Sequence, residues 1–437
     1  MEPKSCQLFS VTRQEPELII PARPTPQEVK QLSDIDNKKS IRIYSPFICF
    51  YRNKPSPPMK GKDPVKLIRE ALSKALVFYY PLAGRLQEGP NRKLMVDCNG
   101  KGVLFVEADA NIKLDQLGDS IHPPFPYLKE IMYGIPHVTR LTCGGFIFAL
   151  LFHHSLCDGP GLKQFLEMLT EFAKGADSPS LMPVWRREIL NARNPPQITC
   201  PLYEQEKRNE STKPFELKSF FFGPEEISAI RNHVPLHLKN STKFELITAC
   251  VWRCRTTALK LKPDQIVRLS CVVNIRGKDY NILPPGYYGN AFASPVVCAK
   301  VDDLCKNPLG YAVELVKKVK ATMNEEYLKS VIDSIGVMGL PVPPIMENLL
   351  VSSTTGQGFE EIDFGWRRPV YAGVAASVPL ISLQFKYQTK DRKDGILVLL
   401  GLPEPTMKKF EEELKQITHG SVEDLYKIKG TELLSKL

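Results

Sequence analysis

The residues of this sequence that could carry chemistry begin with two histidines at the end of an apolar run. In FALLFHHSLCDGPGLKQFL, residues 148–166, His153 and His154 stand side by side and Asp158 follows. A histidine can be neutral at physiological pH and can accept a proton from a reacting hydroxyl group. Successive side chains of a strand point to opposite faces, so only one of the two histidines can face a given cleft. The stretch therefore predicts one candidate general base.

Asp158 has a second, purely structural interpretation. It stands directly before Gly159 and Pro160 at the expected start of a helix, where an aspartate is a favourable N-cap. A metal site would need three ligands, and no other His/Cys cluster completes such a set. Ser155 lacks the Gly-x-Ser-x-Gly elbow of a hydrolase nucleophile. Spacing alone leaves catalysis and helix capping both open.

The elements that must position these residues can be read from the hydrophobic pattern. Residues 144–154 form a short, wholly apolar run, which predicts a doubly buried strand. From Pro160 the apolar residues follow a helical period until Gly175, and residues 62–80 show the same period. Two strand-like runs within residues 92–110 are joined by Asn99-Gly100, which predicts a hairpin.

The length and composition of the chain favour two globular domains. It has 437 residues, 43% of them hydrophobic and 24% charged, which is enough apolar material for two cores. Alternating strand and helix patterns indicate an α/β fold. Residues 181–216 are rich in proline and charge and weak in periodicity. The expected division is an N-terminal domain at 1–180, a crossover at 181–216 and a C-terminal domain at 217–437.

Charge, cysteine content and the chain ends narrow the class of protein. The net charge is +10 with lysines and arginines scattered, which argues against nucleic acid as a partner and suits a small anionic ligand. The 11 cysteines include no Cys-x-x-Cys pair, and no signal peptide or bilayer-spanning run is visible; these features favour a reducing compartment and no membrane partner. Ser435, Lys436 and Leu437 match the tripeptide read by the peroxisomal import receptor. The alternative to an import signal is that these residues are only the frayed end of a helix, and the alternative to a peroxisomal location is the cytoplasm.

Other stretches of the sequence make the interpretation of the His-x-x-x-Asp motif more specific. The DFGWRRP stretch, residues 363–369, follows HHSLCDG far down the chain, and LSDID (32–36), FYYPLAGRL (78–86) and GYYGNAF (286–292) accompany them. This ordered set resembles the plant BAHD acyl-CoA-dependent acyltransferases along essentially the whole chain. Within that family the sequence looks most like the alcohol acyltransferases of the benzyl alcohol O-benzoyltransferase type.

The resemblance implies a fold and a mechanism. The expected fold has two similar-sized α/β domains of the chloramphenicol acetyltransferase-like type, with mixed sheets flanked by helices and an active-site channel at the domain interface. His154 matches the base of the family, which uses neither a metal nor a covalent acyl-enzyme and is monomeric. Asp158 matches an aspartate that pairs with an arginine, here Arg276. Benzoyl-CoA as acyl donor and benzyl alcohol as acceptor are the expected substrates.

The resemblance also suggests supporting residues. Gly159, Gly365 and Trp366 are expected to support the site, and Asp363 matches a residue that some family annotation treats as a second proton acceptor. Contacts to the phosphates of CoA are expected from nearby cations, which could equally be solvated helix residues. These cations are Lys317, Lys318, Lys320, Arg253 and Arg255.

Three departures from the family pattern keep a second hypothesis open. Arg367 replaces the last glycine of the Asp-Phe-Gly-Trp-Gly motif, the stretch 132–141 looks short by a strand-like segment, and residues 203–215 look trimmed. A non-catalytic relative that binds a ligand or a partner is therefore the alternative to an enzyme. Within the enzyme class, other substrates stay possible: acetyl-CoA with a short alcohol, anthraniloyl-CoA with methanol, or an alkaloid alcohol.

Overall fold

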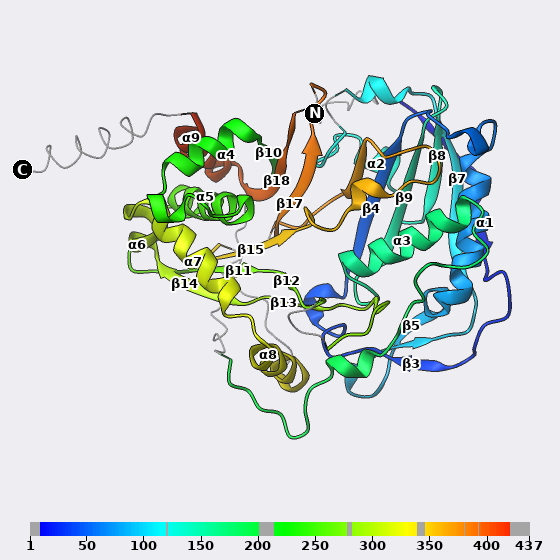
Figure 1. Cartoon of the computed structure of the whole chain (residues 1–437), viewed down its shortest axis with the longest axis horizontal. Helices are drawn as coiled ribbons and strands as arrows, with labels where there is room; N and C mark the ends of the chain where they lie inside the picture. The colour runs from blue at the N-terminus through cyan, green and yellow to red at the C-terminus, as the bar shows by residue number, and fades with distance from the viewer. Residues whose placement is uncertain are drawn as a thin grey trace, which may run out of the picture.

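A computed structural model describes residues 9–118, 121–200, 214–277, 282–338, 346–379, 381–391 and 393–419 of the chain. These residues build two large sheets that lie beside each other, with helices on their outer faces, and two small sheets (Figure 1). The first sheet has the order β1-β7-β8-β9-β4-β16, and β2 also pairs with β7. Only the β7–β8 pair is parallel among these strands. The strands are β1 (Val11–Arg13), β2 (Glu17–Ile19), β4 (Tyr44–Tyr51), β7 (Val103–Ala110), β8 (His137–Leu141), β9 (Phe146–His153) and β16 (Tyr371–Val374).

Strand β9 separates two hydrophobic clusters by the simple alternation of its side chains. Phe146, Phe148 and Leu150 pack in the cluster that includes helices α1 (Pro64–Phe78) and α3 (Gly159–Ala173). Ile147 and Ala149 belong to the cluster that also contains residues of the second sheet. The apolar run of β9 is therefore buried on both faces, as the sequence predicts.

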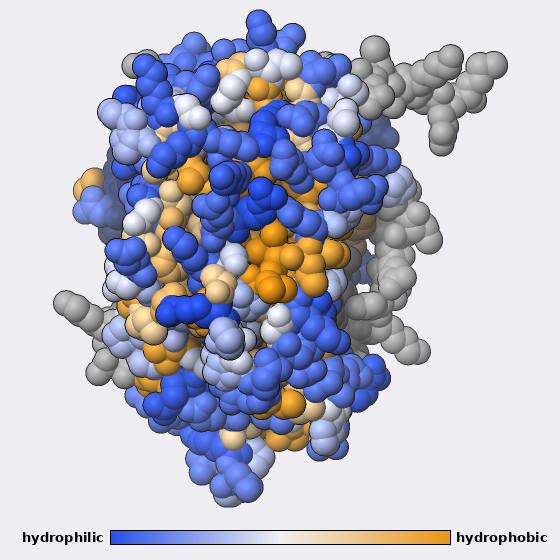
Figure 2. Space-filling model, turned by 90° about the vertical axis from the view of Figure 1, so that its right-hand side faces the viewer, coloured by the Kyte–Doolittle hydropathy of each residue, from blue (hydrophilic) through white to orange (hydrophobic). Residues whose placement is uncertain are grey.

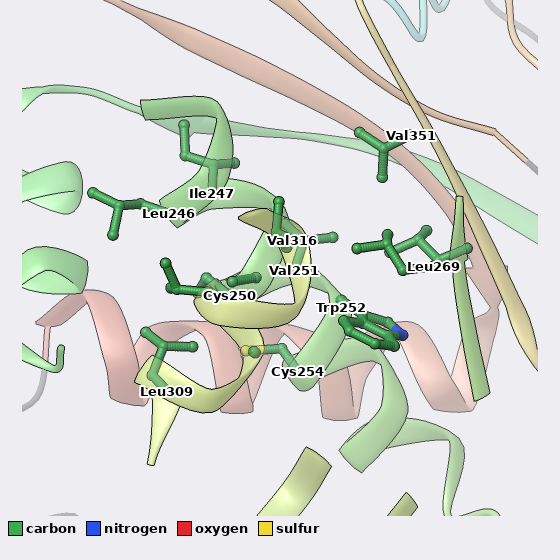
Figure 3. Close-up of a cluster of buried hydrophobic side chains, with 14 of the residues drawn as sticks. Leu246, Ile247, Cys250, Val251, Trp252, Cys254, Leu269, Leu309, Val316 and Val351 are labelled. Carbon is green, nitrogen blue, oxygen red and sulfur yellow. The ribbon is translucent and has the colours of Figure 1, made fainter. Parts of the chain in front are cut away.

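The second sheet has the order β10-β18-β17-β15-β11-β14. Its strands are β10 (Phe215–Phe222), β11 (Ile266–Cys271), β14 (Val296–Lys300), β15 (Asn348–Ser353), β17 (Ile381–Gln388) and β18 (Asp394–Pro403). The accompanying helices are α4 (Pro224–Asn232), α5 (Lys243–Leu259), α6 (Val301–Lys306), α7 (Leu309–Ala321), α8 (Glu325–Met338) and α9 (Glu404–His419). Figure 3 shows how Leu246, Val251 and Trp252 of α5 pack with Leu269 of β11 and Val316 of α7.

The predicted hairpin at Asn99-Gly100 is wrong, although both of its strands form. Strand β6 (Leu94–Asp97) joins β3 (Val29–Gln31) and β5 (Arg85–Glu88) in a small separate sheet, whereas β7 lies in the first sheet. The side chains decide the separation, because Phe105 of β7 is buried with α1 and α3 while Val96 of β6 is buried in another cluster. A local turn signal cannot specify which sheet a strand joins.

The chain crosses back to the first sheet late in the sequence, which corrects the expected domain boundary for one segment. Tyr371–Val374 pairs antiparallel with β4, with Tyr371 opposite Phe50 and Val374 opposite Phe47. Phe364 and Trp366, just before this strand, lie in the same cluster as α1 and α3. The DFGWRRP stretch therefore packs with the first sheet and its helices.

Strand β8 is shorter than both strands that flank it. It pairs with residues 106–110 of β7 and 146–149 of β9, so residues 103–105 and 150–153 continue beyond its first residue, His137. The stretch that looks short in the sequence is thus followed by a strand that starts late beside the strand leading to His154. Figure 2 shows the face that carries α1 and β7, which is mostly hydrophilic with hydrophobic side chains near its centre.

The fold class predicted from the sequence is confirmed: the protein is α/β, with mixed sheets flanked by helices. Three short elements complete the description: α2 (Leu128–Ile131), and the antiparallel pair β12 (Val273–Asn274) and β13 (Phe292–Ala293). A search of the described residues finds no helix with the length and apolar character needed to cross a membrane.

Candidate active site

The imidazole of His154 is held in one orientation by Asn290. His154 Nδ1 lies 3.1 Å from Asn290 Oδ1. The Asn290 amide nitrogen donates to the His154 carbonyl oxygen and to an Asp36 carboxylate oxygen, both at 2.8 Å. Because two acceptors fix the amide nitrogen, Oδ1 must be the group that faces the imidazole. The proton of a neutral His154 therefore sits on Nδ1, and the lone pair of Nε2 is free to accept a proton.

A buried ion pair stands behind Asn290. Asp36 is fully buried and accepts hydrogen bonds from the backbone and side chain of Asn290 and of Ser33. Its second oxygen also accepts from Arg187 at 2.7 Å, and Arg187 is 1% exposed. The guanidinium of Arg187 donates further to the Leu156 carbonyl oxygen at 2.7 Å. Asn290 is thus positioned by a charge pair that has been taken completely out of water.

Asp158 serves the start of helix α3 and an ion pair at the same time. One carboxylate oxygen accepts from the Gly161 N–H at 3.0 Å, which caps the helix. Arg276 donates to both oxygens, at 2.7 and 2.9 Å, and the Ala291 N–H donates to one at 2.9 Å. No hydrogen bond or ion pair joins Asp158 to His154 among these contacts. These bonds connect the start of α3 with Arg276 and with the backbone at Ala291; a supporting role of Asp158 without proton relay stays a prediction.

The Gln357 side chain occupies the space in which a side chain at position 159 would lie. A side-chain carbon added at Gly159 would come within 2.2 Å of Gln357 Oε1. Such an approach is closer than any van der Waals contact allows, so a larger residue would require the end of the Gln357 side chain to move away. The glycine of the His-x-x-x-Asp-Gly motif leaves room for this side chain at the start of α3.

The two adjacent histidines contact different neighbours. The ring of His153 lies 5.1 Å from the ring of Tyr44 on strand β4, and burial lowers the pKa of His153. The ring of His154 packs at 6.4 Å from that of Phe292 and at 6.0 Å from that of Phe152. His154 alone of the pair is joined to the Asn290 network, which makes it the candidate base.

The Asp363 turn packs against strand β9 in the same hydrophobic cluster as helices α1 and α3. Asp363 Oδ1 accepts from the Gly365 N–H at 2.7 Å, and this hydrogen bond lies within the turn itself. Phe364 packs edge-on to Phe148 at 5.3 Å, and Trp366 to Phe146 at 5.4 Å. Gly365 has φ 101°, a conformation that favours glycine. These contacts brace the active-site strand; a role of Asp363 as a proton acceptor stays a prediction.

Arg367 takes up the strained conformation that its position in the motif suggests, with φ 67°. A residue with a Cβ loses about 1–2 kcal/mol in this region, and glycine loses about 0.5–1 kcal/mol more backbone entropy on folding, so Arg367→Gly is expected to raise the free energy of unfolding by about 0.5–1 kcal/mol. Denaturant titration would measure it. Arg368→Gly is the matched control, because Arg368 is exposed and lacks a positive φ; it should destabilise the protein by about 0.5–1 kcal/mol. Equal effects of the two changes would contradict the strain.

Four of the five cations proposed for CoA contacts have protein partners in this structure. Lys317 and Lys320 on α7 pair with Glu245 at 3.3 and 2.8 Å, and Arg253 donates to the Cys305 carbonyl oxygen at 3.0 Å. Arg255 is buried and donates to the Met346 carbonyl oxygen at 3.0 Å. Lys318 is exposed. Contacts of these residues with phosphate stay a prediction.

Sequence reasoning missed three residues of the site. Asp36 and Asn290 lie within the LSDID and GYYGNAF stretches, which served only to support the family resemblance. Arg187 lies in the crossover, where nothing in the local sequence distinguishes it from the other arginines. Its stacking on Trp185, at 4.4 Å from the ring, arises only in the folded chain. Among the residues that the structure describes, no group of three or more His, Cys, Asp or Glu side chains is placed to hold a metal ion.

Comparisons with known proteins identify similar acyltransferases by sequence and similar folds by structure. Residues 9–417 match the Transferase family. The chain is 50% identical to alcohol acyl transferase 1 allele RGb of Malus domestica, over 96% of this chain and 98% of that protein. It is 49% identical to benzyl alcohol O-benzoyltransferase of Petunia hybrida, over 95% of each. Among solved structures, vinorine synthase superposes with a TM-score of 0.75 at 23% identity, over 93% of this chain and 98% of that one.

Proposed function

The chain belongs to the Transferase family, which comprises the BAHD acyltransferases that its motifs resemble. From this premise we propose that the protein transfers a benzoyl group from benzoyl-CoA to benzyl alcohol. At the coarser level it is an acyl-CoA-dependent alcohol O-acyltransferase, since relatives about half identical along nearly the whole chain carry that activity in their names. The petunia relative, named for benzyl alcohol and the benzoyl group, supports the choice of substrates.

The single observation that carries the mechanism is the hydrogen bond between His154 Nδ1 and Asn290 Oδ1. It leaves Nε2 as the acceptor for the alcohol proton. In the proposed step, the alcohol oxygen attacks the thioester carbonyl carbon as its proton passes to Nε2. The C–S bond then breaks, the ester leaves, and the proton on Nε2 returns to the thiolate of CoA. Removing the proton as attack proceeds makes a weak nucleophile effective.

The test is a direct assay for both products. Purified protein is mixed with benzoyl-CoA and benzyl alcohol, and the release of free CoA thiol is followed together with benzyl benzoate by mass spectrometry. We expect both products in equal amounts, and no thiol release when the alcohol is omitted. Turnover with other acyl-CoA and alcohol pairs alone would contradict the benzoyl assignment. Binding of CoA with no turnover of any pair would favour the non-catalytic alternative.

Location and assembly stay predictions. Ser435, Lys436 and Leu437 lie outside the described residues, and peroxisomal import through them is proposed from the sequence only. The monomeric state is proposed from the family resemblance.

A further inference from the structure

Strand β8 leaves part of the first sheet without a strand between its two neighbours. The first residue of β8, His137, lies opposite Val106 of β7 and Ala149 of β9. Residues 103–105 of β7 and 150–153 of β9 continue beyond this point, and no strand of the described residues lies between them there. We call these two stretches together the unpaired segment. The first sheet therefore presents two strand edges that face each other at this place.

The main-chain groups of Leu104 and Leu151 are directed toward each other across the unpaired segment. Alternate residues of a strand direct their N–H and C=O groups to the same neighbour. On β7, the Val106 N–H donates to the Pro136 carbonyl oxygen, and on β9 the Gly145 carbonyl oxygen accepts from the last residue of β8. Leu104 and Leu151 follow these alternations, but β8 does not reach them. No hydrogen bond to a described residue satisfies their main-chain groups on this side.

Solvent exposure along both strands begins where β8 is missing. Residues 146–150 of β9 are all buried, whereas residues 151–153 are partly exposed. On β7, Leu104 is 46% exposed, and so is its cross-strand neighbour on β2, Leu18, at 51%. An accessible strand edge with apolar side chains is a template for pairing with another chain.

The connection that precedes β8 turns away from the unpaired segment. Gly134 has φ 81°, and the chain bends at this residue. The ring of His137 lies across the turn, with Nδ1 2.8 Å from the Ile135 carbonyl oxygen and Nε2 2.8 Å from the Ile131 carbonyl oxygen. Because residues 132–136 form this turn between α2 and β8, they cannot also extend the strand.

The two facing edges select a polypeptide in extended conformation. Where β8 separates them, β7 and β9 lie about 10 Å apart, which is twice the spacing of neighbouring strands and leaves the width of one strand. An extended peptide offers N–H and C=O groups to both neighbours, whereas an alkyl chain or an aromatic ring offers neither. The flanking side chains are apolar on both faces of the sheet, which favours apolar side chains on the entering strand. They are Leu104, Phe105, Leu150, Leu151 and Phe152.

We propose that the unpaired segment is a docking site for an extended apolar segment of a partner protein, which adds a strand between β7 and β9. The added strand continues the established line of β8, parallel to β7 and antiparallel to β9. It would contact Leu151, three residues before His154, and so support the end of the strand that carries the candidate base. The inference does not depend on which acyl donor or alcohol the protein uses.

The experiment measures binding of a synthetic peptide to the full-length protein. The probe has five residues that alternate valine and leucine, polar residues at both ends and a fluorophore, and its binding is followed by fluorescence anisotropy. The matched control is the same peptide with two of the apolar residues N-methylated, which removes two hydrogen-bond donors without changing the charge. We expect saturable binding of the probe at one site, and binding of the control that is weaker by about tenfold or more.

Hydrogen exchange locates the bound peptide on the protein. The amides of Leu104 and Leu151 have no acceptor in the free protein and should exchange rapidly, and bound peptide should slow both. This readout distinguishes strand pairing from adhesion to exposed apolar side chains, because adhesion would leave these two amides unprotected. Absence of saturable binding, or binding without protection of the two amides, overturns the proposal.

Leu104→Glu and Leu18→Glu separate the unpaired segment from the apolar surface beside it. The two leucines are similarly exposed cross-strand neighbours, but only Leu104 lies on a strand that borders the unpaired segment. Leu104→Glu should weaken binding of the probe by about tenfold, because it replaces an apolar contact with a charge, and Leu18→Glu by less than about threefold. Equal losses contradict the assigned place.

A second copy of the chain is the other possible source of a strand. Size-exclusion chromatography of the wild-type protein and of Leu104→Glu tests it. A dimer that Leu104→Glu converts to a monomer would show that a second copy occupies the site and would overturn the assignment to a partner protein. If Leu104→Glu fails to fold by circular dichroism, the N-methylated peptide and hydrogen exchange still decide the proposal with the wild-type protein.

Discussion

Replacing His154 with alanine is expected to lower kcat for acyl transfer by about 10²–10⁴-fold. Asn290 leaves only Nε2 of this imidazole as a proton acceptor, and alanine removes that acceptor. The ring is partly exposed and takes no part in capping α3, so circular dichroism and the unfolding transition should change little. The measurement is thiol release at saturating benzoyl-CoA and benzyl alcohol.

His153→Ala is the matched control, because it removes the adjacent ring, which contacts Tyr44 and has no bond to Asn290. It should keep most of the rate. A His154→Ala protein that retained most of its turnover would exclude His154 as the base, and an equal loss in both variants would point to damage to β9.

The same reasoning gives Asn290→Ala a smaller effect. The imidazole would keep its place on the chain but lose the acceptor that holds the proton on Nδ1. Residues that orient a reacting group in this way typically contribute a factor of about 10–100. We expect that loss in kcat with little change in KM for the alcohol.

Replacing Asp36 with alanine is expected to reduce the free energy of unfolding by about 3–5 kcal/mol. Arg187 is 1% exposed and would remain as a buried charge without its carboxylate. The backbone and side-chain amides of Asn290 would also lose their acceptor. Denaturant titration would measure the loss of stability, and kcat should fall as well because Asn290 is no longer held.

A surface pair provides the comparison for this result. Arg52 and Asp115 form an ion pair in which the Asp115 side chain is 80% exposed, and breaking it by Asp115→Ala should cost at most about 1 kcal/mol. The double change Asp36→Ala with Arg187→Met should recover part of the stability, since no buried charge is then left unpaired. If Asp36→Ala is no more destabilising than Asp115→Ala, the buried pair does not contribute as described.

The resemblance and the motifs in the sequence were sufficient to indicate the family and the fold class. The apolar run before His153 is strand β9, the periodic segment after it is helix α3, and the aspartate between them caps that helix. These elements follow from short-range patterns, because burial on both faces requires continuous apolar residues and a helix start requires a capping acceptor. Arg367 also takes the positive φ that the motif suggests.

The sheet that each strand joins could not be predicted from such short-range patterns. The strands around Asn99-Gly100 were expected to pair with each other and instead join different sheets, and residues 371–374 return to the first sheet. Which edge a strand joins depends on the side chains already packed there, and a local turn signal carries no information about them.

The sequence by itself determined that His154, Asp158 and the Asp363 turn belong to one known set of motifs, and hence the class of reaction. Only the tertiary structure decided how the imidazole of the candidate base His154 is oriented. Asn290 comes from 136 residues away to meet His154, and Arg187 from 151 residues away to meet Asp36. Hydrogen bonds and buried charge pairs depend on distance in space, so residues without a distinctive local pattern acquire their roles only when the chain folds.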